Sequence, residues 1–143
     1  MALQLWPSEI NYSQDSISCH FSNYKLIGET LDDLCESRLS VSDIVPISVK
    51  KINGRWVTWD NRRLWVFRHL ERLGKCKKIP VNNMAYIPES HMTSKCGGRD
   101  VEVRGDPGGR WHKQSSFSLL GTLWTATKIV GVGAIILLTL GKR

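Results

Sequence analysis

Two adjacent arginines, Arg62 and Arg63, stand at the predicted start of a helix, directly after Asp60 and Asn61. The first turn of a helix leaves backbone N–H groups unpaired and carries partial positive charge, and guanidinium groups bind phosphate through paired hydrogen bonds. These four residues therefore form a candidate cradle for phosphate. In that cradle Arg63 and the backbone N–H groups would hold the phosphate, while Asp60 or Asn61 would orient a metal-bound or hydroxyl group.

A second interpretation of the same residues involves no ligand. Asp60 is a natural N-cap, and its carboxylate can pair with a nearby arginine, so that a cap and an ion pair alone would fix the start of the helix. Both interpretations stay open at this point. Replacing Arg63 by alanine separates them, because only the phosphate role predicts a loss of nucleotide-dependent thermal stabilisation.

Hydrophobic spacing predicts the elements that position this turn. Residues 45–52 and 55–59 are β-rich runs joined by Asn53-Gly54, the residue pair that best tolerates a type I′ turn, so the sequence predicts a hairpin. A helix over residues 60–73 follows and is closed by Gly74. Another strand is predicted at residues 79–81.

The amino-terminal part carries weaker patterns. Ile10 and Tyr12 alternate with polar neighbours, which suits a short strand, and residues 13–16 form a polar turn. Residues 30–39 place apolar side chains on one face of an amphipathic helix, with Thr30 as the expected cap. No basic segment followed by a long apolar run opens the chain, so we expect no secretion signal.

The order of these elements, with Asp60-Asn61-Arg62-Arg63 opening the helix and Ile79-Pro80-Val81 as the closing strand, resembles the ParB/sulfiredoxin-like superfamily over residues 8–85. The resemblance implies an α+β fold: a small domain with a mixed sheet and a hairpin-to-helix turn. At that turn members of the superfamily bind a nucleotide phosphate, CTP in ParB and ATP in sulfiredoxin. It therefore implies a nucleotide, with Mg²⁺, or another phosphate-bearing ligand.

The resemblance also assigns individual residues. Arg62 and Arg63 occupy the arginine positions of the motif, and the amino-terminal loop beside the turn adds Gln14 and Asp15, for which an exposed polar turn is an equally good explanation. Asn61 stands where ParB has glutamate and sulfiredoxin its reactive cysteine. Sulfiredoxin chemistry is therefore disfavoured, since it needs a thiolate beside the phosphate. Chromosome partitioning is disfavoured as well, because no helix-turn-helix module follows.

Charge and cysteine content indicate which partners and sites are expected. The formal net charge of +7 favours polyanionic neighbours, whether a nucleotide, a nucleic acid or an anionic membrane surface. The four cysteines are widely spaced, with no CxxC pair and no histidine at a zinc-like interval, so we predict reduced thiols and no metal site.

Beyond the predicted domain at residues 8–90, glycine and proline predict a linker at residues 91–116, in which residues 101–103 suit a short strand. Residues 117–140 are long and apolar enough for a transmembrane helix. Their one ionisable residue, Lys128, costs about 2.5–3.5 kcal/mol at the centre of a bilayer. An interfacial helix or a helix packed on the domain are the alternatives.

A spanning helix there predicts a single-pass carboxyl-terminal anchor with the domain facing the cytosol; without it a cytoplasmic or nuclear location is expected. Three functions follow from these patterns. The first is a membrane-tethered domain that binds a nucleotide or other phosphate-bearing ligand, with no catalysed reaction assigned. The second is a protein-interaction module that keeps the fold but not the pocket. The third is a DNA-binding or nuclease-like protein, whose binding would weaken steeply with salt.

Overall fold

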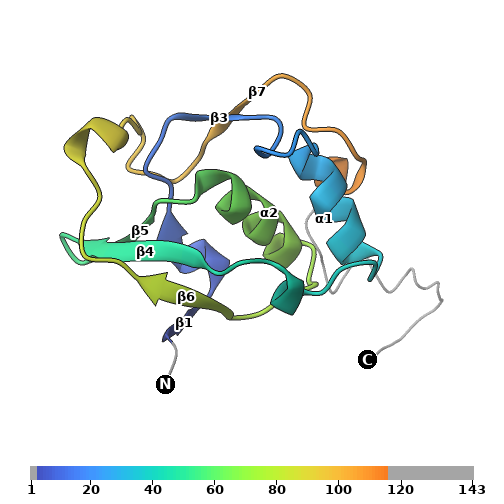
Figure 1. The fold of residues 1–143 in the computed structure, drawn as a ribbon, viewed down its shortest axis with the longest axis horizontal. Coiled ribbons are helices and arrows are strands. Elements are labelled where there is room, and N and C mark those ends of the chain that lie inside the picture. The colour runs from blue at the N-terminus through green and yellow to red at the C-terminus, as the bar shows by residue number, and fades with distance from the viewer. Residues whose placement is uncertain (1–2, 116–143) are drawn as a thin grey trace.

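A curled mixed sheet and two α-helices make up the computed structural model, which describes residues 3–115 (Figure 1). The sheet has the strand order β1-β6-β4-β5-β2, in which β1–β6 and β4–β5 are antiparallel and β4–β6 and β2–β5 are parallel. Its strands are β1 (Leu3–Leu5), β2 (Ile10–Asn11), β4 (Ile47–Ile52), β5 (Arg55–Thr58) and β6 (Ile79–Asn83). The predicted α+β class is therefore confirmed.

The predicted hairpin and the helix that follows it are confirmed. Strands β4 and β5 are joined by Asn53 (φ 51°) and Gly54 (φ 80°), both in the left-handed conformation that a type I′ turn requires. Only Trp59 and Asp60 separate β5 from helix α2 (Asn61–Arg72), and Gly74 (φ 75°) follows the helix in the left-handed conformation expected beyond a helix end.

Helix α2 buries one whole face in the core of the domain. Leu64, Val66, Phe67 and Leu70 are almost fully buried, because α2 packs on the sheet and on α1 (Ile27–Cys35). Its far side faces β3 (Ser16–Ser18), so that the helix lies between two layers of β-structure (Figure 1). This position fixes the first turn of α2 firmly in the domain.

The predicted start of the first helix is wrong. Helix α1 begins at Ile27 rather than at Thr30, and no side chain caps it. Its first N–H groups are satisfied by distant carbonyl groups instead: Ile27 donates to Cys19 at 3.0 Å and Gly28 donates to Pro107 at 2.7 Å. Tertiary acceptors thus replace the cap that the sequence pattern placed at Thr30.

Residues 93–114, which we call the C-terminal strap, lie against the domain throughout. Strand β7 (Glu102–Arg104) of the strap pairs in parallel with β3, and it overlaps the short strand predicted at residues 101–103. Before it, the N–H group of Tyr12 donates to the carbonyl of Gly98 at 2.8 Å. The described part of the predicted linker at residues 91–116 is therefore a packed part of the fold.

Glycines allow the strap to approach the domain closely. A Cβ atom on Gly28 would lie 1.9 Å from the carbonyl oxygen of Gly108, and a Cβ atom on Gly98 would lie 2.4 Å from the carbonyl oxygen of Tyr12. No side chain fits at either place. The residues that suggested flexibility in the sequence are thus used for tight backbone packing.

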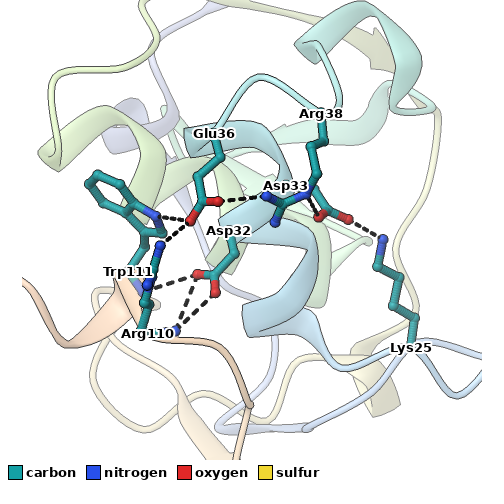
Figure 2. A network of polar contacts seen from close by, with 7 residues as sticks. All are labelled: Lys25, Asp32, Asp33, Glu36, Arg38, Arg110 and Trp111. Carbon is teal, nitrogen blue, oxygen red and sulfur yellow. Dashed lines mark hydrogen bonds and ion pairs between the residues drawn. The ribbon is translucent and has the colours of Figure 1, made fainter.

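The carboxyl-terminal half of the strap is fastened to α1 by acidic side chains (Figure 2). Asp32 accepts the backbone N–H groups of Arg110 and Trp111, the latter at 3.0 Å. Glu36 accepts the Trp111 indole N–H at 2.9 Å and the Arg110 guanidinium at 2.8 Å. Arg72 of α2 completes the attachment, because it donates to two carbonyl groups further along the strap.

Residues 3–115 also contain four 3₁₀ turns: η1 (Pro7–Glu9), η2 (Val41–Asp43), η3 (Glu89–His91) and η4 (Trp111–Lys113). Among the residues that the structure describes, no helix has the length and apolar character needed to cross a bilayer. The transmembrane helix predicted at residues 117–140 lies outside them.

Candidate functional site

A hollow of about 340 Å³ opens at the first turn of α2. It is bounded by α2, by β3 and its following loop, by η3 and by β7, segments that are far apart in sequence. Its walls are predominantly polar, and three arginines contribute to them. The lining residues are Gln14, Ile17, Ser18, Phe21, Trp59, Asp60, Asn61, Arg62, Arg63, His91 and Arg104.

Five of the six residues predicted for the phosphate site line this hollow, and Asp15 does not. Asp15 is exposed and contacts the strap: its N–H group donates to the Thr93 hydroxyl at 3.1 Å, and its carboxylate accepts from the same hydroxyl at 3.2 Å. Asp15 thus helps to attach the strap, while its neighbour Gln14 forms part of the wall.

Asp60 occupies the N-cap position of α2, but its carboxylate makes no capping hydrogen bond. One oxygen accepts the backbone N–H of Ser48 at 2.6 Å, and the other forms an ion pair with Arg63 at 2.7 Å. No described side chain caps this helix end, so the N–H groups of its first turn are left to water or a ligand. The helix start therefore keeps its anion-binding character.

The two arginines differ in how far the protein already uses them. Arg63 donates to the carbonyl of Val45 at 2.6 Å, to that of Pro46 at 3.3 Å, and to Asp60. Among the described residues Arg62 has a single acceptor, the carbonyl of His20 at 2.9 Å. Arg62 thus retains donors for a ligand, whereas Arg63 chiefly braces the turn.

Asn61 is buried and joins the helix start to the amino-terminal loop. Its side-chain oxygen accepts the N–H of Ser13 at 2.8 Å, and its amide group donates to the hydroxyl of the same serine at 2.9 Å. A longer contact of 3.4 Å reaches the N–H of Gln14. These bonds occupy the amide, so Asn61 shapes the hollow instead of offering a ligand group to it.

His91 and Arg104 also line the hollow, and neither was predicted from the sequence. His91 stacks flat on Trp59, with 4.0 Å between the ring centroids and 7° between the planes, and its Nε2 atom is buried without a hydrogen-bond partner among the described residues. Arg104 projects from β7 and donates to the Ser16 hydroxyl at 2.6 Å. Both residues lie in or beside the segment that was expected to be a linker, and no local motif marks them.

The charge of the lining is positive. Arg62, Arg63 and Arg104 contribute three guanidinium groups, and the one acidic lining residue, Asp60, is paired with Arg63. Within residues 3–115 no three His, Cys, Asp or Glu side chains lie close enough to hold a metal ion together. The chemistry that the walls offer is the binding of an anion.

A second hollow of about 470 Å³ lies on the other side of the same two arginines. It shares Phe21, Arg62 and Arg63 with the first hollow, and its remaining walls are more apolar, with side chains from α1, α2 and the loop before β4. Phe21 lies under the Arg62 guanidinium, with 5.8 Å between the guanidinium carbon and the ring centroid. Arg62 therefore stands between a polar and a more apolar space.

Comparison of the chain with protein-family models, with curated proteins and with solved structures found no match.

Proposed function

We propose that this chain is a membrane-tethered domain of the ParB/sulfiredoxin-like type that binds a nucleotide or another phosphate-bearing ligand in the hollow at the start of α2. The observation that carries the proposal is the set of donors around one space: the guanidinium groups of Arg62 and Arg104 and the uncapped first turn of α2. Its volume, about 340 Å³, falls in the range of small-molecule sites.

Arg62 is the residue that we assign to the phosphate. Its guanidinium has one protein acceptor among the described residues, whereas Arg63 has three, including Asp60. A ligand phosphate at Arg62 would accept charge-assisted hydrogen bonds and also meet the helix N–H groups. This differs from the sequence-based assignment, in which Arg63 held the phosphate.

The adjoining apolar hollow supports a ligand with two chemically distinct parts. A phosphate beside Arg62 would place the rest of the molecule next to Phe21, where the walls become apolar. A nucleotide has that division, with its charge at one end and a planar base at the other. The hairpin-to-helix turn supports the same assignment, since it is the feature on which the family resemblance depends.

The test is a ligand screen on the full chain in detergent, with the melting temperature as the readout. CTP, ATP and GTP with Mg²⁺ are compared with inorganic phosphate and pyrophosphate. A ligand at a hundred times its dissociation constant should add about 2.7 kcal/mol of stability. We expect Arg62→Ala to abolish the shift, Arg62→Lys to retain part of it, and the control Arg99→Ala, an exposed arginine outside the hollow, to leave it unchanged.

The ion pair between Asp60 and Arg63 favours the main alternative, an interaction module that keeps the fold without a ligand. In that case no compound raises the melting temperature, and Arg62→Ala behaves like the wild-type chain. Binding to DNA would instead give an affinity that falls steeply with salt and ignores the nucleotide.

The membrane tether in this proposal is supported by the sequence of residues 117–140, where Lys128 is the only ionisable residue. After reconstitution into lipid vesicles the full chain should stay in the membrane pellet on extraction with alkaline carbonate. Release into the supernatant would show that the segment is not inserted.

A further inference from the structure

We propose that the face formed by η4 and the loop between α2 and β6 docks on the anionic surface of a lipid bilayer. The face carries the exposed residues Lys75, Lys77, Lys78, Arg110 and Lys113. The proposal rests on the membrane tether of the proposed function and goes beyond it, because a tethered domain need not touch the membrane. Three observations support the inference: the attachment of the strap to the domain, the short spacing between the strap and residues 117–140, and the charge of this face.

The strap is held by the domain almost to the start of the apolar stretch. Arg72 donates to the carbonyl of His112 at 2.7 Å and to that of Gln114 at 2.6 Å. The apolar stretch begins at Phe117, three residues after Gln114. Three residues span at most about 10 Å even when the chain is fully extended. An inserted stretch would therefore leave Gln114 within about 10 Å of the hydrocarbon, at the depth of the lipid headgroups.

The strap constrains the orientation of the domain relative to the membrane as well as its distance from the membrane. Asp32 and Glu36 of α1 bind the backbone, the guanidinium and the indole of Arg110 and Trp111 (Figure 2). The strap cannot swing away from α1 without breaking these bonds. A membrane that is entered just beyond Gln114 would therefore meet this side of the domain first.

The charges on this side suit an anionic surface. The Lys75 ammonium lies 5.0 Å from the centroid of the Trp111 ring, so the loop after α2 and η4 form one continuous face. Lys77 and Lys78 continue in the same loop, and Lys113 lies in η4. Among the described residues none of these four lysines forms an ion pair.

The acidic residues beside the face are already used by the protein. Asp32 and Glu36 accept hydrogen bonds from the strap, and Glu71 accepts the N–H and the hydroxyl of Ser8 at 2.8 and 2.9 Å. The lysine ammonium groups remain available for lipid phosphates and carboxylates. Attraction of this kind acts over a Debye length of about 8 Å. The short connection to the apolar stretch keeps the lysine face close enough to the lipid headgroups for this attraction.

The experiment is residue-resolved acetylation of the full chain in vesicles, with mass spectrometry as the readout. Vesicles of phosphatidylcholine alone are compared with vesicles that also contain phosphatidylserine. We expect Lys75 and Lys113 to react about fivefold more slowly on the anionic vesicles, a factor that corresponds to about 1 kcal/mol of attraction per lysine. Lys51 of the β4–β5 hairpin and Lys95 near the other end of the strap are internal controls and should react equally on both.

Lys77 and Lys78, which lie on the same face, should also react more slowly on the anionic vesicles. The double substitution Lys75→Glu with Lys113→Glu should remove this protection, whereas Lys51→Glu should not. Both variants should remain folded in detergent, because these side chains are exposed and each variant loses one surface cation–π contact, with Trp111 or with Trp56. The proposal is overturned if Lys75 and Lys113 react at the same rate on the two kinds of vesicle. This includes the result in which both lysines react slowly on both kinds, because a protein contact, and not the lipid charge, would then protect them.

Failure of the docking face and failure of the tether give different results. If alkaline carbonate retains the chain in the vesicles while Lys75 and Lys113 react alike on both, the tether stands and the docking face is rejected. If carbonate releases the chain, the tether is rejected and the docking face with it. Neither result changes the melting-temperature shift expected from a phosphate-bearing ligand in detergent.

Discussion

Asn61 and Ser13 hold each other through two reciprocal hydrogen bonds in the interior of the domain. The Asn61 oxygen accepts the Ser13 backbone N–H at 2.8 Å, and the Asn61 amide donates to the Ser13 hydroxyl at 2.9 Å. Both residues are buried, so water cannot replace either bond. The pair joins the first turn of α2 to the loop that leads to β3, and together they set the shape of the hollow.

Replacing Asn61 by alanine should destabilise the domain by about 2–3 kcal/mol, because the substitution leaves buried polar groups of Ser13 without partners. Urea unfolding of the wild type and the variant measures the difference. Ser13→Ala should cost less than Asn61→Ala, and the double variant should cost less than the sum of the two. Additive costs would mean that the two side chains do not act as a pair.

Gly28→Ala should destabilise the protein by about 2 kcal/mol or more, although alanine normally favours a helix by about 1 kcal/mol relative to glycine. The added Cβ would lie 1.9 Å from the carbonyl oxygen of Gly108, so α1 and the strap would have to separate. Thermal unfolding and protease cleavage within the strap report the change. Gly54→Ala is the matched control: its cost is backbone strain alone, since the space around it is open.

The attachment of the strap should depend on pH through Glu36. Hydrogen bonds from the Trp111 indole, Arg38 and Arg110 lower the pKa of Glu36 from 4.5 to about 2. The carboxylate therefore contributes stability above pH 4.5 that is lost as the pH falls towards 2. Hydrogen exchange at the amides of residues 110–113 should accelerate over that range. Glu36→Gln should remove most of this dependence. The pKa of Asp33 is also lowered, chiefly by its hydrogen bond with Lys25, but Asp33 contacts Lys25 and Arg38 and not the strap.

A second pH effect should come from His69 between pH 4 and 6.5. Burial, followed by the charges of Arg72 and His112, lowers the pKa of His69 from 6.5 to about 4. In this range the unfolded chain binds the proton and the folded chain does not, so stability should rise with pH by on the order of 3 kcal/mol. Denaturant titrations at several pH values measure the slope, and His69→Gln should flatten it. An unchanged slope in that variant would assign the effect to other groups.

The four cysteines should differ widely in reactivity at neutral pH. Hydrogen bonds from the backbone N–H of Asp100 and from Ser94 lower the pKa of Cys96, whereas burial raises the pKa values of Cys35 and Cys76 to about 11. Because the thiolate is the reactive form, iodoacetamide should label Cys96 well before Cys35 or Cys76. Peptide mapping after brief labelling tests the order, and Cys96→Ser should leave the slow reactions of Cys35 and Cys76 unchanged.

The hairpin and α2 could be predicted because their determinants are local. Asn53 and Gly54 adopt the left-handed conformations that their residue types favour, and Gly74 does the same beyond α2. The position of Asp60 before the helix was also predictable. An ion pair between Asp60 and a nearby arginine was also one of the two interpretations of the sequence, and Arg63 forms it. The hydrogen bond from Ser48 could not be predicted, because the pairing of β4 with β5 brings Ser48 to Asp60.

The strap could not be predicted because its determinants are distant in sequence. Glycines are frequent both in flexible linkers and in segments that pack closely against another backbone, so their presence alone does not separate the two. Only the packing partner does so, as in the close approach of Gly108 to Gly28. Arg104 reaches the hollow through the pairing of β7 with β3, which is only three residues long, and His91 reaches it from η3, just before the strap. The start of α1 was misplaced for a related reason, since carbonyl groups of Cys19 and Pro107 replace the expected cap.

Helix α2 separates the two places on the domain to which we assign partners, the hollow at its start and the strap at its end. Its twelve residues span about 18 Å. Arg62 lies in the first turn, and Arg72, in the last turn, donates hydrogen bonds to the strap. If the strap end rests on a bilayer, the hollow lies at the opposite end of α2 from that contact. A phosphate-bearing ligand at Arg62 would then be bound at the end of the helix away from the strap.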